Sequence, residues 1–152
     1  MKLILPEALK TEIARAAKDA FPRECCGLIE GVRVADGFHA RALHPARNLA
    51  EAADRFEIDP ADHVAALKAA RARGQDVIGC YHSHPGGKAR PSPADRAGAG
   101  QDGFLWLIAA GDGDRLAGFV WRAPDFEDVF LTETCMDGGE ASISRFPLAP
   151  IV

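Results

Sequence analysis

The sequence predicts an α+β domain in which a mixed β-sheet is layered between helices, in an α-β-α arrangement. Short apolar and partly β-branched stretches recur along the chain, as is typical of strands. Three helical stretches interrupt them, and each begins with a proline or a capping side chain, near residues 6, 59 and 92. A chain of 152 residues is most simply one domain with its own core.

The N-terminal part begins with a short strand at residues 3–5, and a helix follows over residues 6–21 with Pro6 at its start. One apolar face predicts that helix: Leu9, Ile13, Ala16, Ala17 and Ala20. Pro22 ends it.

The next apolar stretches, residues 25–29 and 32–34, predict a hairpin that turns at Glu30 and Gly31. Residues 39–44 alternate enough to form a further strand, which Pro45 ends.

Residues 55–58 alternate in character and predict a short strand. The next helix begins at Asp59 as N-cap and Pro60 at the first helical position. We expect this helix to stop near Gly74. Its inward residues are expected to be Val64, Leu67 and Ala70.

A strand is predicted at residues 77–81, and a short helix opens at residues 92–95. Residues 104–109 read as a buried strand, and residues 116–122 are expected to pair back with it as a hairpin. Residues 126–131 predict the last strand.

Composition excludes several function classes. The formal charge of -4 argues against nucleic-acid binding, which needs a basic face. The longest apolar run, residues 104–110, is far short of the ~20 residues of a transmembrane helix, so no membrane association is expected. The N-terminal apolar stretch is too short for a signal peptide, and adjacent Cys25 and Cys26 make an awkward disulfide framework. We expect reduced thiols and a cytoplasmic protein.

Chemistry-bearing residues gather at His82-Ser83-His84-Pro85 and, further on, at Ser92 and Asp95. His82 and His84 share one face if the backbone is extended, because side chains alternate along a strand. Two histidines, one aspartate and a position for water are the ligand set of a catalytic zinc site. Ser92 and Asp95 are equally explained as an S-x-x-D helix cap, although a capping residue can also be a ligand.

Two points stay open at the level of the residues. Cys80 lies two residues before His82, so Cys80-x-His82-x-His84 is a rival ligand set. A hydrolytic site also needs a general base, and spacing alone does not select Glu24, which lies far upstream.

The chain resembles the JAMM (MPN-plus, JAB-domain) zinc metalloproteases. Their signature is H-x-H, seven residues, S, two residues and D, with a catalytic glutamate upstream. Here His82 and His84 are followed by residues 85–91, Ser92 and, two residues on, Asp95. The pattern P-x-E-x-C-G at residues 22–27 resembles the short prokaryotic branch of the family. That branch also tends to have counterparts of Asn48, Phe56 and the Asp59-Pro60 helix start, so the likeness runs over residues 3–131.

The resemblance implies a cytidine-deaminase-like MPN/JAMM fold, with a mixed sheet curved around helices. Residues 1–132 would be the catalytic domain and residues 133–152 an extended C-terminal tail. His82, His84 and Asp95 would bind one Zn²⁺ per chain together with a water.

Two further residues receive catalytic roles from the resemblance. Glu24 would take a proton from the attacking water and deliver it to the leaving amine. Ser92 would donate a hydrogen bond to the oxyanion.

The family likeness also implies a substrate class: the bond after the C-terminal glycine of a ubiquitin-like or sulfur-carrier protein. Tail maturation, deconjugation and release of an adduct all remain open, as do sulfur-carrier metabolism and bacterial conjugation or antiphage defence as settings. A non-catalytic MPN scaffold and a metal-dependent hydrolase of small amides are the alternatives. A homodimer is compatible with the family, whose members form dimers in several arrangements.

Overall fold

The computed structural model describes residues 1–133, so the predicted tail from residue 134 onward lies outside the described residues. The elements, in chain order, are β1 (Lys2–Ile4), α1 (Glu7–Ala20), β2 (Cys26–Val34), β3 (Gly37–Ala46), α2 (Pro60–Ala72), β4 (Asp76–His84), α3 (Pro93–Gly98), β5 (Leu105–Ala110), β6 (Arg115–Arg122) and β7 (Asp125–Thr132).

The strands form one mixed sheet in the order β1-β3-β2-β4-β5-β6-β7, which closes on itself because β1 pairs in parallel with both β3 and β7. β4 lies between β2, to which it is antiparallel, and β5, to which it is parallel. Both edges of β4 are therefore hydrogen-bonded, which holds the strand that carries the two histidines rigidly.

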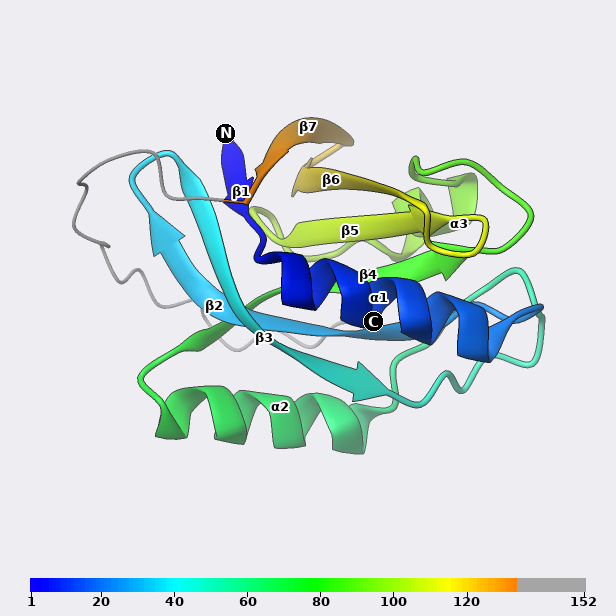
Figure 1. The fold of residues 1–152 in the computed structure, drawn as a ribbon, viewed down its shortest axis with the longest axis horizontal. Helices are drawn as coiled ribbons and strands as arrows, with labels where there is room; N and C mark the ends of the chain where they lie inside the picture. Colours follow the sequence, from blue (N-terminus) through cyan, green and yellow to red (C-terminus); the bar gives the residue numbers. More distant parts are fainter. Residues whose placement is uncertain (134–152) are drawn as a thin grey trace.

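Helices cover the two faces of the sheet (Figure 1). On one face α1 packs through Leu9 and Ile13 into a core with Tyr81 and Leu107. On the other face α2 packs through Ala66 and Ala70 into a second core. β4 contributes to both cores, with Ile78 and Tyr81 on the α1 side and Val77 and Cys80 on the α2 side. The irregularity in its pairing with β2, between Ile29 and Glu30, interrupts the strict alternation of side chains at this place. The predicted α-β-α layering is confirmed.

Helix α2 starts as predicted but faces the sheet differently. The Asp59 side chain accepts a hydrogen bond from the Ala61 N–H at 2.8 Å, so Asp59 is the N-cap. The prediction that Val64 points inward is wrong, because its side chain is 49% exposed. Ala70 is buried as predicted, and Leu67 packs against the core. Ala66 is buried in place of Val64, which lets the helix axis come close to the sheet.

The predicted hairpin turn at Glu30 and Gly31 is also wrong. β2 is one continuous strand, and its register shifts by a bulge at this point. The turn lies after Val34, which pairs with Gly37 across a two-residue connection. Glu30 does not face solvent as a turn residue would: it is 1% exposed and pairs with Arg73.

Residues 55–58 do not join the sheet, contrary to the prediction of a strand. They form a single antiparallel bridge, between Ile58 and Asn48. Other elements differ from prediction only at their ends: β4 extends to His84, and the first helix begins at Glu7 with Pro6 as its N-cap.

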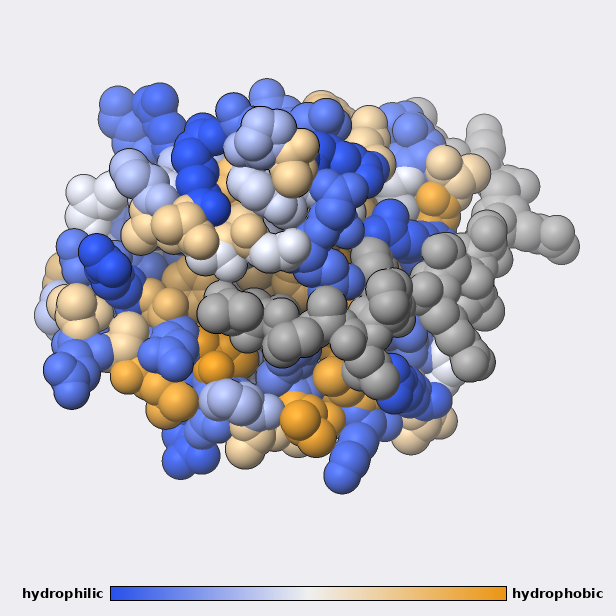
Figure 2. Space-filling model, turned by 180° about the vertical axis from the view of Figure 1, so that it is seen from behind, coloured by the Kyte–Doolittle hydropathy of each residue, from blue (hydrophilic) through white to orange (hydrophobic). Residues whose placement is uncertain are grey.

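The face opposite to that of Figure 1 is largely hydrophilic, with hydrophobic residues gathered in its lower half (Figure 2). Within residues 1–133, no helix has the length and apolar character needed to span a membrane. Cys25, Cys26 and Cys80 are all free thiols.

Candidate metal centre

The two histidines lie at the C-terminal end of β4. His82 is fully buried and His84 is half-buried. The His82 ring stacks on Phe56, with the ring centroids 4.2 Å apart, and meets the edge of Trp106 at 5.8 Å. Its Nδ1 atom is buried and has no hydrogen-bond partner within residues 1–133. Aromatic packing, not a hydrogen bond at Nδ1, therefore orients this imidazole.

Asp95 comes to the histidines from α3. The side chains and backbones of Ser92 and Asp95 form the predicted capping box, with the Ser92 N–H donating to Asp95 Oδ2 at 2.9 Å and the Asp95 N–H donating to Ser92 Oγ at 3.0 Å. This cap aims the carboxylate at the end of β4. Its oxygens lie 3.1 Å from His82 Nε2 and 3.2 Å from His84 Nε2.

The donor atoms converge as the ligands of one cation do. The Nε2 atoms of His82 and His84 are 2.9 Å apart, which completes a triangle with the Asp95 carboxylate. Ligands ~2.0–2.1 Å from a tetrahedral zinc lie ~3.3–3.4 Å from one another, so this triangle is slightly contracted but of the right size.

The protonation states of the three side chains are also compatible with a metal site. His84 Nδ1 lies 2.9 Å from the Lys88 carbonyl, to which it must donate, so the neutral ring directs a lone pair from Nε2 at the centre. Burial lowers the pKa of His82 and so favours its neutral form. Burial raises the pKa of Asp95, but contacts with the two histidines outweigh it and hold that pKa well below its usual range. Burial lowers the pKa of His84 too, but the Asp95 carboxylate and the Lys88 carbonyl outweigh it and raise that pKa, so a cation at Nε2 would displace a proton. Two imidazoles and a carboxylate converge as donors, and the set fits a zinc ion.

Glu24 lies at the same centre, in the loop between α1 and β2. One carboxylate oxygen and one nitrogen from each of His82 and His84 all lie within 4.8 Å of one another. Glu24 and the two histidines thus form a candidate metal group. The Asp95 oxygens lie closer, at most 3.2 Å from a ring nitrogen of each histidine. Glu24 therefore lies at the rim of the candidate centre.

The Glu24 side chain is 6% exposed, and burial raises its pKa to about 7. The charge of His84 opposes this shift, and the charges of Asp95 and Asp54 add to it. A carboxyl group with a pKa near neutrality can both accept and release a proton at physiological pH.

Ser92 retains a free proton despite its role as a cap. Its oxygen accepts the Asp95 N–H with one lone pair, and the hydroxyl proton remains available to donate. Ser92 shares a cavity of about 580 Å³ with Glu24 and His84, so its hydroxyl borders the space beside the centre.

Cys80, the rival ligand, does not join the centre. It is fully buried in the core beneath α2, and burial raises the pKa of its thiol well above the ordinary value. A metal ligand must be a thiolate, which this burial disfavours. Within residues 1–133 the candidate metal group at this place contains Glu24 and the two histidines but no cysteine.

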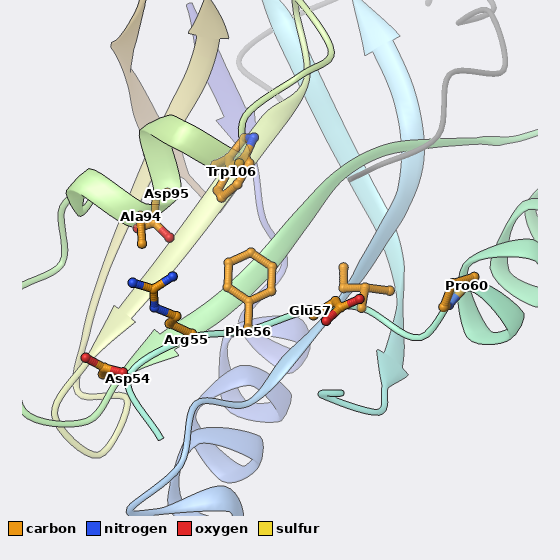
Figure 3. A pocket seen from close by; sticks show the side chains of 10 residues that line it. Asp54, Arg55, Phe56, Glu57, Pro60, Ala94, Asp95 and Trp106 are labelled. Atoms are coloured by element: carbon orange, nitrogen blue, oxygen red, sulfur yellow. The ribbon is translucent and has the colours of Figure 1, made fainter. Parts of the chain in front are cut away.

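A second cavity, of about 360 Å³, is lined by Asp95. Phe56 and Trp106, whose rings meet edge to face with centroids 5.8 Å apart, also line it, and Asp95 reaches it from α3 (Figure 3). The first cavity is lined by Glu24 and His84 and the second by Asp95, so each cavity borders the candidate centre, and Asp54 lines both.

Sequence reasoning missed Ser83 as a functional residue and did not explain Asn48. The Cys25 N–H donates to Ser83 Oγ at 2.8 Å, and Asn48 Nδ2 donates to the Glu24 carbonyl at 3.1 Å. One signal in the sequence could have found Ser83. A serine between two histidines of a strand points to the opposite face, and its hydroxyl needs a hydrogen-bond partner if that face is buried.

Comparisons with known proteins agree with this geometry. Residues 6–123 match the family described as prokaryotic homologs of the JAB domain. A desampylase of Haloferax volcanii is 36% identical over 109 residues, which cover 71% of this chain and 76% of that relative.

Solved structures share the fold. A protein of Desulfitobacterium hafniense has a TM-score of 0.76 at 28% identity, over 88% of this chain and 95% of its own. A JAB1/MPN domain protein of Archaeoglobus fulgidus has a TM-score of 0.53 at 22% identity, over 88% and 97%. The chain therefore belongs to the JAB/MPN family, in its prokaryotic branch of JAB-domain proteins.

Proposed function

We propose that this protein is a zinc-dependent JAMM-type peptidase that hydrolyses the amide bond after the C-terminal glycine of a ubiquitin-like or sulfur-carrier protein. The observation that carries the proposal is the convergence of His82 Nε2, His84 Nε2 and the Asp95 carboxylate within 2.9–3.2 Å of one another. The raised pKa of Glu24 beside them supports a hydrolytic rather than a structural site.

His82, His84 and Asp95 would hold the zinc. Bound there, the metal would polarise a water and the scissile carbonyl, which is the chemistry of a three-ligand zinc site with an open position.

Glu24 is the general base of this proposal. Its carboxylate would accept the proton of the attacking water and then release that proton to the nitrogen of the leaving amine. Burial raises its pKa to about 7 in the metal-free site, and the charge of a bound zinc would lower that value, which favours the carboxylate that accepts the first proton.

Ser92 would donate its hydroxyl proton to the oxyanion that forms on the scissile carbonyl. As the N-cap of α3, the Ser92 oxygen accepts the Asp95 N–H with one lone pair, so the hydroxyl proton stays free to donate. The rigid cap would keep the donor in place without reorganisation.

Residues 56–58 support binding of an extended tail. The backbone N–H and C=O groups of Phe56 and Ile58 make no hydrogen bonds within residues 1–133, because the bridge to Asn48 uses the groups of the alternate residues. These residues line the cavity that leads to Asp95. An extended peptide can add to such an open strand edge, and a glycine-terminated tail is thin enough for the slot.

The Haloferax volcanii relative supports a deconjugating activity, since that protein is a desampylase. The family likeness includes both ubiquitin-like modifiers and sulfur carriers as substrates. Cleavage assays with each class of protein decide between them.

Zinc content and two variants test the site. The purified protein should contain about one zinc per chain, because the three donors define one ion. Glu24→Gln should keep the zinc and lose nearly all cleavage, whereas His84→Ala should lose the zinc itself. Full activity of Glu24→Gln would contradict the assigned base.

Candidate substrates decide the partner class. The protein is incubated with fusions of ubiquitin-like and sulfur-carrier proteins to a reporter, and with small amides, with and without a chelator. Chelator-sensitive cleavage after the terminal glycine is the expected result. Zinc binding without any cleavage would support a scaffold, and cleavage of small amides alone would support the amidase alternative.

A further inference from the structure

Glu24 lies outside the regular hydrogen-bond ladder of the sheet, and its carboxylate forms no hydrogen bond within residues 1–133. The position of that carboxylate therefore depends on how the backbone around it is anchored. Two side chains that the mechanism does not use, Ser83 and Asn48, provide these anchors from opposite sides of the residue.

Ser83 anchors the C-terminal side. Its hydroxyl accepts the Cys25 N–H at 2.8 Å, and its own N–H donates to the Cys25 carbonyl at 3.2 Å. Ser83 is fully buried between the two histidines of β4, on the opposite face of the strand. The same peptide segment that presents the metal-binding rings thus holds the residue next to the base.

Asn48 anchors Glu24 itself. Its Nδ2 donates to the Glu24 carbonyl at 3.1 Å and to the Arg55 carbonyl at 2.9 Å. Its Oδ1 accepts the N–H groups of Ala50 at 2.9 Å and Glu57 at 3.0 Å. All four hydrogen bonds of the amide are used, and they join the base to the segment that lines the smaller cavity.

We propose that Ser83 and Asn48 are positioning residues that clamp the Glu24 backbone between them, and that Asn48 also couples Glu24 to the substrate-lining segment at residues 55–57. This inference rests on the proposed role of Glu24 as general base. Neither side chain touches the reacting atoms, so each acts through Glu24.

Kinetics of Ser83 variants test the first anchor. Ser83→Ala should lower kcat ~10- to 100-fold, because a small displacement of a catalytic group is enough for such a loss. KM and zinc content should not change. Ser83→Thr keeps the hydroxyl and should restore most of kcat. The matched control is Cys80→Ala, a similarly small truncation on the same buried strand but on the other face, and it should keep both kcat and zinc.

Asn48→Asp tests the second anchor with little change in shape. The variant keeps the Oδ acceptors and removes both Nδ2 donors. It should lower kcat and also raise KM, because the segment at residues 55–57 loses its link. An unchanged KM would overturn the coupling to the substrate-lining segment.

A double-variant cycle separates positioning from general stability. In the Glu24→Gln background, Ser83→Ala should cause no further loss of activity, since the group that it positions is already disabled. An equal loss in both backgrounds would overturn the clamp, and so would a kcat loss in Cys80→Ala as large as that in Ser83→Ala.

Amide hydrogen exchange gives a readout without catalysis. The Cys25 amide should exchange faster in Ser83→Ala than in the parent or in Cys80→Ala, while neighbouring β2 and β4 amides keep their protection. Unchanged Cys25 exchange would overturn the inference. A parent protein that binds zinc but cleaves nothing refutes the proposed function instead, and the exchange data still decide whether the clamp exists.

Discussion

Neutralising Glu30 should destabilise the fold without disturbing the candidate metal centre. The Glu30 side chain is 1% exposed in the bulge of β2. Its carboxylate accepts hydrogen bonds from Arg73 at the end of α2, with Nε at 2.8 Å, and lies 2.7 Å from His44 Nε2 on β3. Glu30 thus joins a helix and two strands through one buried charge.

Glu30→Gln keeps the shape but turns an amide NH₂ group toward the Arg73 guanidinium, where two donors meet. Losing a hydrogen bond to a charged group costs ~1.5–3 kcal/mol. Because the Arg73 side chain is 55% exposed, it can turn to solvent and is not left as a buried unpaired charge, so the loss should be about 2 kcal/mol. That is a large part of the ~5–15 kcal/mol that stabilises an ordinary domain.

The loss should depend on pH. The Arg73 hydrogen bonds, helped by His44, outweigh burial and lower the pKa of Glu30. A carboxyl with a depressed folded-state pKa stabilises the fold fully above its unfolded pKa, ~4.3, and progressively less as the pH falls toward its folded-state value. The difference in unfolding free energy between parent and Glu30→Gln should therefore be constant from pH 6 to 7, on the order of 2 kcal/mol, and shrink below about pH 4.

Urea unfolding followed by circular dichroism measures this difference. Asp36→Asn is the control, because the Asp36 side chain is 70% exposed and its pair with Lys2 should contribute only ~0–1 kcal/mol. The reasoning is refuted if Glu30→Gln costs less than about 1 kcal/mol at pH 7, the range of a surface pair, or if its cost is the same at acidic pH.

Three further substitutions have definite outcomes. Phe56→Ala removes the ring stacked on His82 and should weaken zinc affinity ~10- to 100-fold, since groups that support metal ligands affect affinity by that factor. A competitive chelator titration measures this, and unchanged affinity would show that stacking does not orient the His82 ring. Ser92→Ala should lower kcat ~10²–10³-fold and stability by ~1 kcal/mol, the losses of an oxyanion donor and an N-cap, and an unaltered kcat would remove Ser92 from the mechanism. Gly27→Ala would place a Cβ 2.4 Å from the Tyr81 ring, so its thermal midpoint should fall by several degrees, and a midpoint equal to that of the parent would argue against this packing.

Local signals in the sequence predicted much of the structure. Asp59-Pro60 and Ser92-Pro93 mark helix starts because caps act within one turn, and both helices begin there. The period-2 alternation of β4 was enough to put His82 and His84 on one face at the end of a strand.

Predictions that depend on remote partners were less successful. Glu30-Gly31 has the composition of a turn, but Arg73 and His44 bury the charge and hold it inside a strand. Val64 has the hydrophobicity of a core residue, but the close approach of α2 through Ala66 and Ala70 leaves it outside. Residues 55–58 have the alternation of a strand, but the sheet offers them no free neighbour.

By itself, the sequence determined the family likeness, the layered α+β class and the residues with the right chemistry for a metal centre, because these depend on spacing and on side-chain type. Only the tertiary structure decided how that chemistry is assembled. It brought Glu24 to the histidines from more than fifty positions upstream, left Cys80 in the core, and made Ser83 and Asn48 the supports of the Glu24 loop. Long-range hydrogen bonds and burial depend on which segments come into contact in three dimensions, and local sequence patterns do not predict those contacts.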